Sequence, residues 1–199
     1  MSAPGRQAAR SEATRAKLIA VGIDLFSERG FAGVGTEEIV ERAEVTRGAL
    51  YHHFGDKRDL FRAVHEELEQ RLVAEIGAAL EANPSEDPFD ALEVAAGAVL
   101  DVAIDRKLAR VTLIDAPSVL GWEEWREIDT RYGLGLAEAV LGAAMEGGGM
   151  TRQPVRPLAH LLVAALGEAA IMVATAPSPK KARAQVEPAL RTLLRGLAT

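Results

Sequence analysis

Residues 36–57 contain two short amphipathic segments joined by a very tight turn, and this pattern limits the fold more than any other stretch. The first segment, residues 36–43, turns apolar side chains to one side and carboxylates to the other. The second, residues 45–54, repeats apolar side chains at helical spacing, which would bury one side of a short helix. About three residues separate the two, and short helices joined so tightly form a helix-turn-helix.

The outward side of the second helix carries an unusual set of hydrogen-bond donors. They are Thr46, Arg47, Tyr51, His52 and His53, with Lys57 just past the helix end. Such groups suit base edges and phosphate oxygens, and the second helix of a helix-turn-helix enters the major groove of DNA. The spacing alone does not decide the matter, because many all-α proteins contain helical corners.

Several stretches around this motif combine into a longer signature. They are Gly30-Phe31, Thr36-Glu37-Glu38-Ile39, the segment from Val45 to Phe54, Lys57 and Leu60. Across residues 11–61 they resemble the N-terminal signature of the tetracycline-repressor (TetR) family of transcriptional regulators. The resemblance implies a homodimeric DNA-binding regulator, usually a repressor that a small molecule releases from its operator.

The motif and the resemblance together assign candidate DNA contacts. The candidate base readers are Thr46, Arg47, Tyr51 and His52, and the candidate phosphate contacts are Arg10, Thr36, His53 and Lys57. Gly35 and Gly48 complete the predicted DNA-binding positions. A two-fold dimer needs half-sites roughly one helical turn or a multiple apart, so the predicted operator is an inverted repeat.

Two positions depart from the family pattern. Gly35 stands where related sequences usually place Ser or Thr as a helix cap, so a phosphate contact through that hydroxyl is lost unless Thr36 or a backbone amide supplies it. Glu44 stands in the turn where the family favours Gly. If the backbone there is left-handed, Glu44 is strained by roughly 1 kcal/mol.

The formal net charge of -6 by itself disfavours a nucleic-acid partner, but the charge is unevenly distributed along the chain. Residues 1–60 hold nine basic and nine acidic side chains, so the remaining residues carry the whole excess. Residues 1–17 contain four bases and one acid, and residues 46–58 contain three bases and one acid. Charge near the contact governs attraction to phosphates more than the global sum does. The alternative is that these are ordinary solvated surface charges.

The whole chain is predicted to be all-α, with about nine helices and no run of alternating β-branched residues. The expected helices cover residues 12–28, 36–43, 45–54, 57–82, 89–104, 106–114, 122–146, 157–174 and 180–197. This pattern predicts three units: a mobile N-terminal arm at residues 1–10, a helix-turn-helix domain at 11–58, and an effector-binding and dimerisation domain at 59–199.

The last two helices carry more apolar surface than one chain can easily hide. Leucine, alanine and methionine cover much of residues 158–173, and Val186, Leu190, Leu193, Leu194 and Leu197 form a stripe on the final helix. Pairing with their copies in a four-helix interface would bury this excess. The alternative is that both stripes belong to the intramolecular core.

The region between the DNA-binding part and these helices, residues 89–155, is the expected sensory region. Asp115, Trp122, Trp125 and Tyr132 bring polar tips and aromatic faces near a Pro/Gly break, which suits an effector pocket. The alternative is that these aromatic residues belong to the core.

Several classes of protein are excluded by what the sequence lacks. It has no cysteine, and its first 17 residues have no apolar core like that of a signal peptide. The apolar segment 161–176 contains Glu168 and is short for a membrane span. His52 and His53 are adjacent and cannot chelate one ion together, while His65 and His160 are isolated. We therefore expect a cytoplasmic protein without metal or other cofactor.

No catalytic arrangement stands out either, so the predicted function is transcriptional regulation and not catalysis. The predicted partners are double-stranded operator DNA, a second copy of the chain and a small-molecule effector. The competing hypothesis is an all-α ligand-binding protein or enzyme that keeps the helix-turn-helix only as scaffold.

Overall fold

The computed structural model describes residues 3–85 and 87–197, and this part of the chain is helical with no β-strand. The elements are α1 (Ala3–Arg29), α2 (Thr36–Arg42), α3 (Arg47–His53), α4 (Lys57–Ala82), α5 (Pro88–Ile104), α6 (Arg106–Ala109), the π-helical turn η1 (Arg110–Asp115), α7 (Ala116–Leu120), α8 (Trp122–Glu146), α9 (Val155–Thr175) and α10 (Pro179–Arg195). Since α6, η1 and α7 succeed one another without a break, the described residues form nine helical stretches, as predicted.

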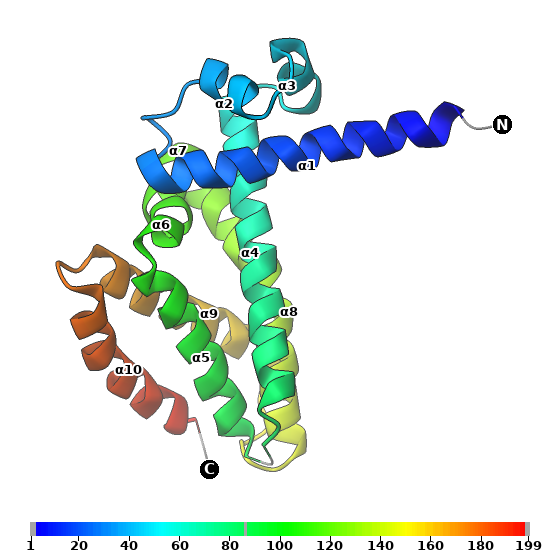
Figure 1. Cartoon of the computed structure of the whole chain (residues 1–199). Helices are drawn as coiled ribbons and strands as arrows, with labels where there is room; N and C mark the ends of the chain where they lie inside the picture. The colour runs from blue at the N-terminus through cyan, green and yellow to red at the C-terminus, as the bar shows by residue number, and fades with distance from the viewer. Residues whose placement is uncertain (1–2, 86, 198–199) are drawn as a thin grey trace.

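The first three helices form a head at one end of the molecule (Figure 1). Leu18, Leu25 and Phe26 of α1 are fully buried or nearly so, against apolar residues of α2, α3 and α4. α1 is followed directly by Gly30, whose backbone is left-handed (φ 74°) and whose amide donates to the Phe26 carbonyl. Phe31 then packs edge-on against Phe61, with ring centroids 5.2 Å apart. Apolar packing along α1 thus fixes the position of α2 and α3.

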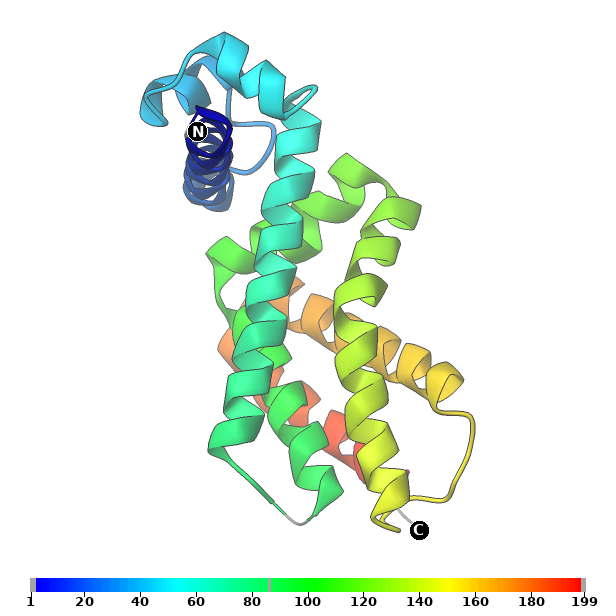
Figure 2. The same ribbon diagram turned by 90° about the vertical axis from the view of Figure 1, so that its right-hand side faces the viewer.

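Helix α4 joins the head to the rest of the molecule. Its first turns pack against α1, and its later turns lie beside α5 and α8 (Figure 2). The close approach of α1 depends on Gly22, because a Cβ there would lie 2.7 Å from the Val64 side chain. One apolar core runs without interruption from Leu18 in α1 to Ile128 in α8. The boundary at residues 58 and 59 therefore falls within a shared core, and the domain limits stay a prediction.

Helices α5, α8, α9 and α10 form the body together with the lower half of α4. Helix α9 is long and apolar enough to cross a membrane by length and composition, yet only a third of its most apolar window is buried. It packs against α5, α8 and α10, as a helix of a folded core does. Its remaining apolar surface is left uncovered by this chain.

The N-terminal helix is longer than the sequence predicted. α1 begins at Ala3, where we expected a mobile arm up to residue 10 and a helix from about residue 12. Residues 7–10 are exposed and helical, while Met1 and Ser2 lie outside the described residues. Alanine and arginine are strong helix formers, so this stretch continues the helix without needing an apolar face.

Candidate DNA-binding surface and ligand cavity

The turn between α2 and α3 has the geometry that the sequence predicted. Gly35 caps α2 from an extended backbone and makes no side-chain cap hydrogen bond. Glu44 adopts a left-handed backbone with φ 50°, the conformation for which the sequence predicts strain at a residue other than glycine. Its carboxylate accepts a hydrogen bond from Lys17 Nζ at 2.7 Å, and this contact holds the pKa of Glu44 below its ordinary value.

Arg47 and Tyr51 lie on the outward face of α3. The Arg47 side chain is 61% exposed, and Tyr51 is among the exposed large side chains of the protein. The guanidinium lies 5.6 Å from the centre of the Tyr51 ring and donates to Glu37 at 2.8 Å. Hydrogen bonding to Tyr51, followed by attraction to Tyr51 and Glu37, raises the pKa of Arg47. The charged end is therefore preserved and accessible, although it must exchange Glu37 for any new partner.

The other candidate DNA contacts on α3 differ in whether their side chains are exposed or already form a hydrogen bond within the protein. His52 is exposed, His53 is half-buried, and their rings stand edge to face with centroids 5.2 Å apart. The Thr46 hydroxyl accepts the Ala49 amide at 3.1 Å, so it caps α3 and can reach DNA only as a shared group. Gly48 is exposed beside it, with no crowding around the position of a Cβ. The open face of α3 is thus formed by Arg47, Tyr51 and His52.

Three further candidates flank this face at its edges. Arg10 is exposed on α1, and Thr36 is half-buried at the first position of α2. Gly35 is exposed with open space around it. Their contacts with DNA stay predictions, since the fold leaves all three close to solvent without assigning a partner.

Lys57 has a structural task that the sequence did not reveal. Its ammonium donates to the carbonyl oxygens of Phe31 and Val34, both at 2.9 Å, and lies 4.0 Å from the centre of the Phe31 ring. Burial lowers the pKa of Lys57. An ammonium has three N–H donors, so only one remains for a phosphate. Lys57 therefore ties the α1–α2 loop to the start of α4, beside any role in DNA binding.

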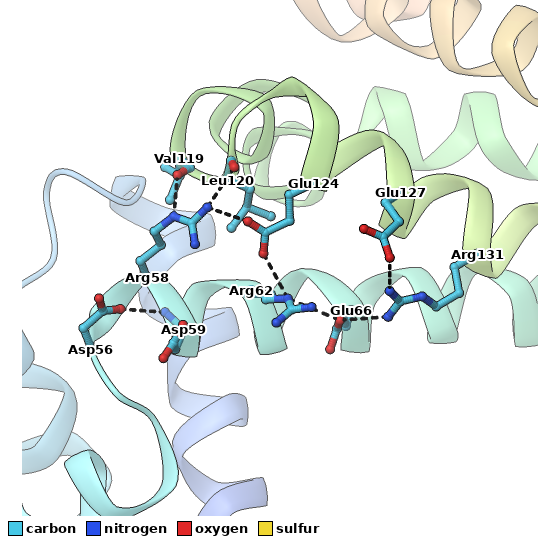
Figure 3. Close-up of polar contacts among 10 residues, drawn as sticks. All are labelled: Asp56, Arg58, Asp59, Arg62, Glu66, Val119, Leu120, Glu124, Glu127 and Arg131. Atoms are coloured by element: carbon cyan, nitrogen blue, oxygen red, sulfur yellow. Dashed lines mark hydrogen bonds and ion pairs between the residues drawn. The ribbon is translucent and has the colours of Figure 1, made fainter.

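A polar network fastens the start of α4 to α7 and α8 (Figure 3). Arg58 donates to the carbonyl oxygens of Val119 and Leu120 at 3.0 and 2.8 Å and also pairs with Glu124. Arg62 reaches the other oxygen of Glu124 at 3.1 Å. These bonds satisfy carbonyl groups at the end of α7 that its own helix leaves free. They hold the head at a defined angle to the body.

The four residues predicted to contact an effector do not line a common pocket. Asp115 accepts the Phe31 amide at 2.7 Å and so links η1 to the head. Trp122 is 61% exposed, while Trp125 is buried and donates from its indole nitrogen to the Thr112 carbonyl. The Tyr132 hydroxyl accepts a hydrogen bond from Gln70 at the surface. Trp125 is thus an aromatic core residue, as the alternative hypothesis for these positions stated.

The cavity lies deeper, between α4, α5, α8 and α9, and has a volume of about 250 Å³. Its walls are mostly apolar, including Leu68, Ile76, Val99, Val140 and Leu166. None of the four predicted residues is part of the wall. Thr112 and Leu113 of η1 do line it, so the π-helical turn touches the cavity and, through Asp115, the head.

Two carboxyl groups that are largely buried interrupt this apolar wall, although the sequence had shown no such pair. Glu69 on α4 and Asp129 on α8 both line the cavity and lie close enough to interact electrostatically. Burial, with the charge of Asp129 as a second cause, raises the pKa of Glu69 to about 8. Burial also raises the pKa of Asp129 to about 6, against the opposing effect of Arg126. Among the described residues, no three side chains form a metal-binding group.

His65, which looked isolated in the sequence, completes this cluster. Its side chain is fully buried, and Nδ1 lies 3.7 Å from Glu69 Oε1. Neither ring nitrogen has a hydrogen-bond partner among residues 3–85 and 87–197, and burial lowers the pKa of His65 to about 4. The spacing of His65 and Glu69, one helical turn apart, was the signal in the sequence, but it had no meaning without the cavity.

The uncovered apolar surface of the body lies on α9 and α10. Leu161 is 69% exposed, Met172 is 53% exposed, and Leu193 on α10 is 66% exposed. Leu162, Val173 and Leu190 on the same helices point into the core instead. Each helix is therefore apolar on two sides, of which this chain covers one.

Comparison with known proteins gives matches over most of the chain. Residues 18–64 match the model described as "Bacterial regulatory proteins, tetR family", and residues 89–197 match the model described as "Tetracyclin repressor-like, C-terminal domain". A TetR-family transcriptional regulator from Pectobacterium atrosepticum has a solved structure with 32% sequence identity and a TM-score of 0.83. The match covers 96% of this chain and 97% of that one.

Two curated relatives match over shorter segments. The Transposon Tn10 TetC protein of Escherichia coli is 29% identical over 122 residues, or 61% of this chain and 60% of the relative. The HTH-type transcriptional regulator AcrR of Shigella flexneri is 32% identical over 103 residues, or 52% of this chain and 47% of the relative. These matches thus span about half of each protein's length.

Proposed function

This chain belongs to the tetracycline-repressor (TetR) family, and from that premise we propose that it is a homodimeric transcriptional repressor which a small molecule releases from DNA. The observation that carries the proposal is the outward face of α3. Arg47 and Tyr51 are exposed there, while Leu50 on the same helix is fully buried. A helix held by one side and polar on the other is the form in which proteins read the major groove.

The predicted DNA contacts are consistent with this placement. Arg47, Tyr51 and His52 would read base edges, with Thr46 contributing through its shared hydroxyl. Arg10, Thr36 and His53 would hold phosphates at the margins, and the free N–H of Lys57 would add one contact. Arg47 leaves Glu37 for DNA at small cost, because both side chains are largely exposed and exposed ion pairs contribute roughly 0–1 kcal/mol.

The dimer would form through α9 and α10. Leu161, Met172 and Leu193 are exposed on the sides of these helices that face away from the core. Pairing each helix with its copy would remove them from water in a two-fold, four-helix interface. The two copies of α3 would then face successive major grooves, which requires an inverted-repeat operator.

The effector would act from the cavity through the π-helical turn. Thr112 and Leu113 line the cavity, while Asp115 and Arg110 of the same turn bond to the Phe31 amide and the Glu28 carbonyl of the head. A ligand that moves η1 would therefore move the head. Release occurs only if the ligand binds this altered state more tightly than the DNA-bound state.

Fluorescence anisotropy with the DNA upstream of the protein's own coding region tests the proposal. We expect tight binding to one inverted repeat, a strong decrease in affinity as salt rises, and loss of binding when an effector is added. Equal affinity for unrelated DNA would contradict the role of α3 as a sequence reader. Turnover of a bound small molecule would favour the competing hypothesis of an enzyme built on the same scaffold. In either case we expect the protein to act in the cytoplasm, where its DNA lies.

A further inference from the structure

The cavity has four charged residues in its wall, and they differ in their access to water. Arg71 and Glu75 are exposed, and Arg71 is already paired with Glu67 at 2.9 Å. Glu69 and Asp129 are instead 12% and 21% exposed. Since both of them line the cavity, a ligand in it would lie against their side chains.

Glu69 has no hydrogen-bond donor of its own in the described part of the chain. The nearest polar partner is His65 Nδ1 at 3.7 Å, which is beyond hydrogen-bond range. His65 also brings no positive charge at neutral pH, because it is fully buried and its pKa is lowered. A buried carboxylate without a donor or a counter-charge is costly, so Glu69 keeps its proton at neutral pH, and a further partner would be needed to stabilise its ionised form.

Asp129, in contrast, has a positively charged partner, because the guanidinium of Arg126 lies 3.4 Å from its carboxylate on the same helix. One positive charge therefore faces two carboxyl groups, and the walls from α5 and α9 add none. When Glu69 and Asp129 are both ionised the cluster therefore lacks one cation, and at lower pH the proton on Glu69 takes its place. The space beside it is apolar and smaller than the roughly 300–1,000 Å³ of common ligand pockets.

We propose that the ligand of this cavity is a compact organic cation, with its ammonium nitrogen beside Glu69 and Asp129 and its apolar body against the walls from α5, α8 and α9. This inference rests on the proposed function and names the chemical class of its effector. A cation supplies the missing charge, and a small hydrocarbon body fills a space lined by leucine, valine and isoleucine. A carboxylate ligand would place a third negative group beside two others.

The proposal predicts that binding displaces a proton. Below its pKa of about 8, Glu69 holds a proton, which a bound cation must expel before the carboxylate can pair with it. The groups that face Glu69 are His65 on its own helix and Asp129 on α8, while Arg126 on α8 pairs with Asp129. At neutral pH Glu69 is therefore the carboxyl group that still holds a proton for a cation to displace. Affinity for a permanently charged ligand should therefore rise on the order of tenfold between pH 6.5 and pH 8.5.

Two probes of the same shape separate charge from hydrophobic fit. Phenyltrimethylammonium carries a permanent positive charge, and tert-butylbenzene has the same shape with carbon in place of nitrogen. Isothermal titration of the full chain at pH 8.5, without DNA, should show binding of the cation at least about tenfold tighter than that of the hydrocarbon. Equal affinities, or preference for the hydrocarbon, would overturn the proposal.

Variants identify the responsible group. Glu69→Gln should weaken binding of the cation by about tenfold or more, change binding of the hydrocarbon by less than about twofold and remove the pH dependence. Glu81→Gln is the matched control, because it removes an exposed carboxylate from α4 outside the cavity wall and should leave both affinities unchanged. If Glu69→Gln does not fold, Asp129→Asn with the same two probes decides the matter. Weakening of both probes alike by each variant would show that the carboxyl groups only shape the cavity.

Adding operator DNA separates this inference from the proposed function. Release of DNA by the cation but not by the hydrocarbon supports both. Binding of the cation to a protein that never binds DNA would support the ligand class while contradicting the repressor. Sequence-specific DNA binding by a protein that does not bind the cation would support the repressor while contradicting the ligand class.

Discussion

The face of α3 and the wall of the cavity both carry ionisable side chains, and the fold treats them in opposite ways. Arg47 lies at the surface, where its side chain is 61% exposed and keeps its charge. Glu69 is withdrawn from water, and its pKa rises to about 8. The first arrangement suits a large, charged partner that brings its own counter-ions. The second suits a small partner that must compensate a specific buried group.

The same contrast separates the energetic roles of the two regions. An exposed charge contributes little to folding, so α3 can change its side chains without unfolding the head. A buried acid changes the free energy of unfolding with pH, because the folded and unfolded chains bind its proton differently. Substitutions in the cavity wall should therefore alter stability and its pH dependence, whereas substitutions on the face of α3 should alter DNA affinity.

Glu69→Gln should stabilise the protein at high pH, and this is the largest effect that we expect. In the wild type the folded chain keeps the Glu69 proton up to about pH 8, while the unfolded chain loses it near pH 4.5, so stability falls as pH rises between these values. Glutamine has no proton to lose. We expect a gain of a few kcal/mol in the free energy of unfolding at pH 8.5, which vanishes below about pH 4.5. Urea unfolding at both pH values measures it, and a gain that is equal at both would contradict burial as the cause.

Arg47→Ala should weaken specific DNA binding by about 1–3 kcal/mol and relax base preference, because a bidentate base contact is lost. The free energy of unfolding should change by less than about 0.5 kcal/mol, since the side chain is exposed. Arg42→Ala, an equal charge change at an exposed position of α2, is the control. Fluorescence anisotropy with specific and scrambled DNA compares the Arg47→Ala and Arg42→Ala variants. Unchanged affinity of Arg47→Ala for the specific site would contradict the assignment of Arg47 as a base reader.

Lys57→Met should lower the free energy of unfolding by about 1–2 kcal/mol, because the carbonyl groups of Phe31 and Val34 lose a charged donor. Methionine keeps the apolar stem and removes only the ammonium. If Lys57 served only as a phosphate contact, its replacement would instead reduce the slope of log DNA affinity against log salt concentration by about one unit. Thermal unfolding together with a salt titration compares the two roles. A flatter salt dependence at unchanged stability would show that Lys57 serves DNA and not the loop.

Glu44→Gly should raise the free energy of unfolding by up to about 1 kcal/mol, since glycine adopts the left-handed backbone without strain. The lost pair with Lys17 offsets little of this gain, because both side chains are well exposed. Glu41→Gly, at an exposed helical position of α2, should instead destabilise the protein. A lower unfolding temperature for Glu44→Gly would mean that the pair with Lys17 outweighs the strain.

The two regions also differ in how far the sequence predicts them. The α2–turn–α3 unit depends on neighbours within a few residues, so its helices, its Gly35 cap and the left-handed Glu44 could all be predicted. The tasks of Lys57 and Arg58 could not, because the carbonyl groups they bind lie 23 to 62 residues away along the chain. The same separation hid the link from Asp115 to the Phe31 amide.

The cavity could not be predicted from short stretches of sequence either, because the residues that line it are far apart along the chain. Glu69 and Asp129 lie on different helices, and each looks like an ordinary surface acid until four helices enclose them. Large aromatic residues drew the prediction towards Trp122 and Trp125 instead. One of these is buried in the core with its indole bonded to Thr112, and the other lies at the surface. A pocket is a property of assembled helices, and residue type alone does not locate it.

The π-helical turn Arg110–Asp115 limits how this chain can change length during evolution. A π-turn accommodates an extra residue within a helix, as a single-residue insertion would leave it. Deleting one residue there would restore α-helical winding, so the side chains within the turn would change direction while the flanking helices keep their register. Arg110 and Asp115 bond to the head from within this turn, and those bonds depend on its π-helical geometry. We therefore expect insertions and deletions among descendants of this gene to accumulate in the loop 147–154 and to be absent from residues 110–115.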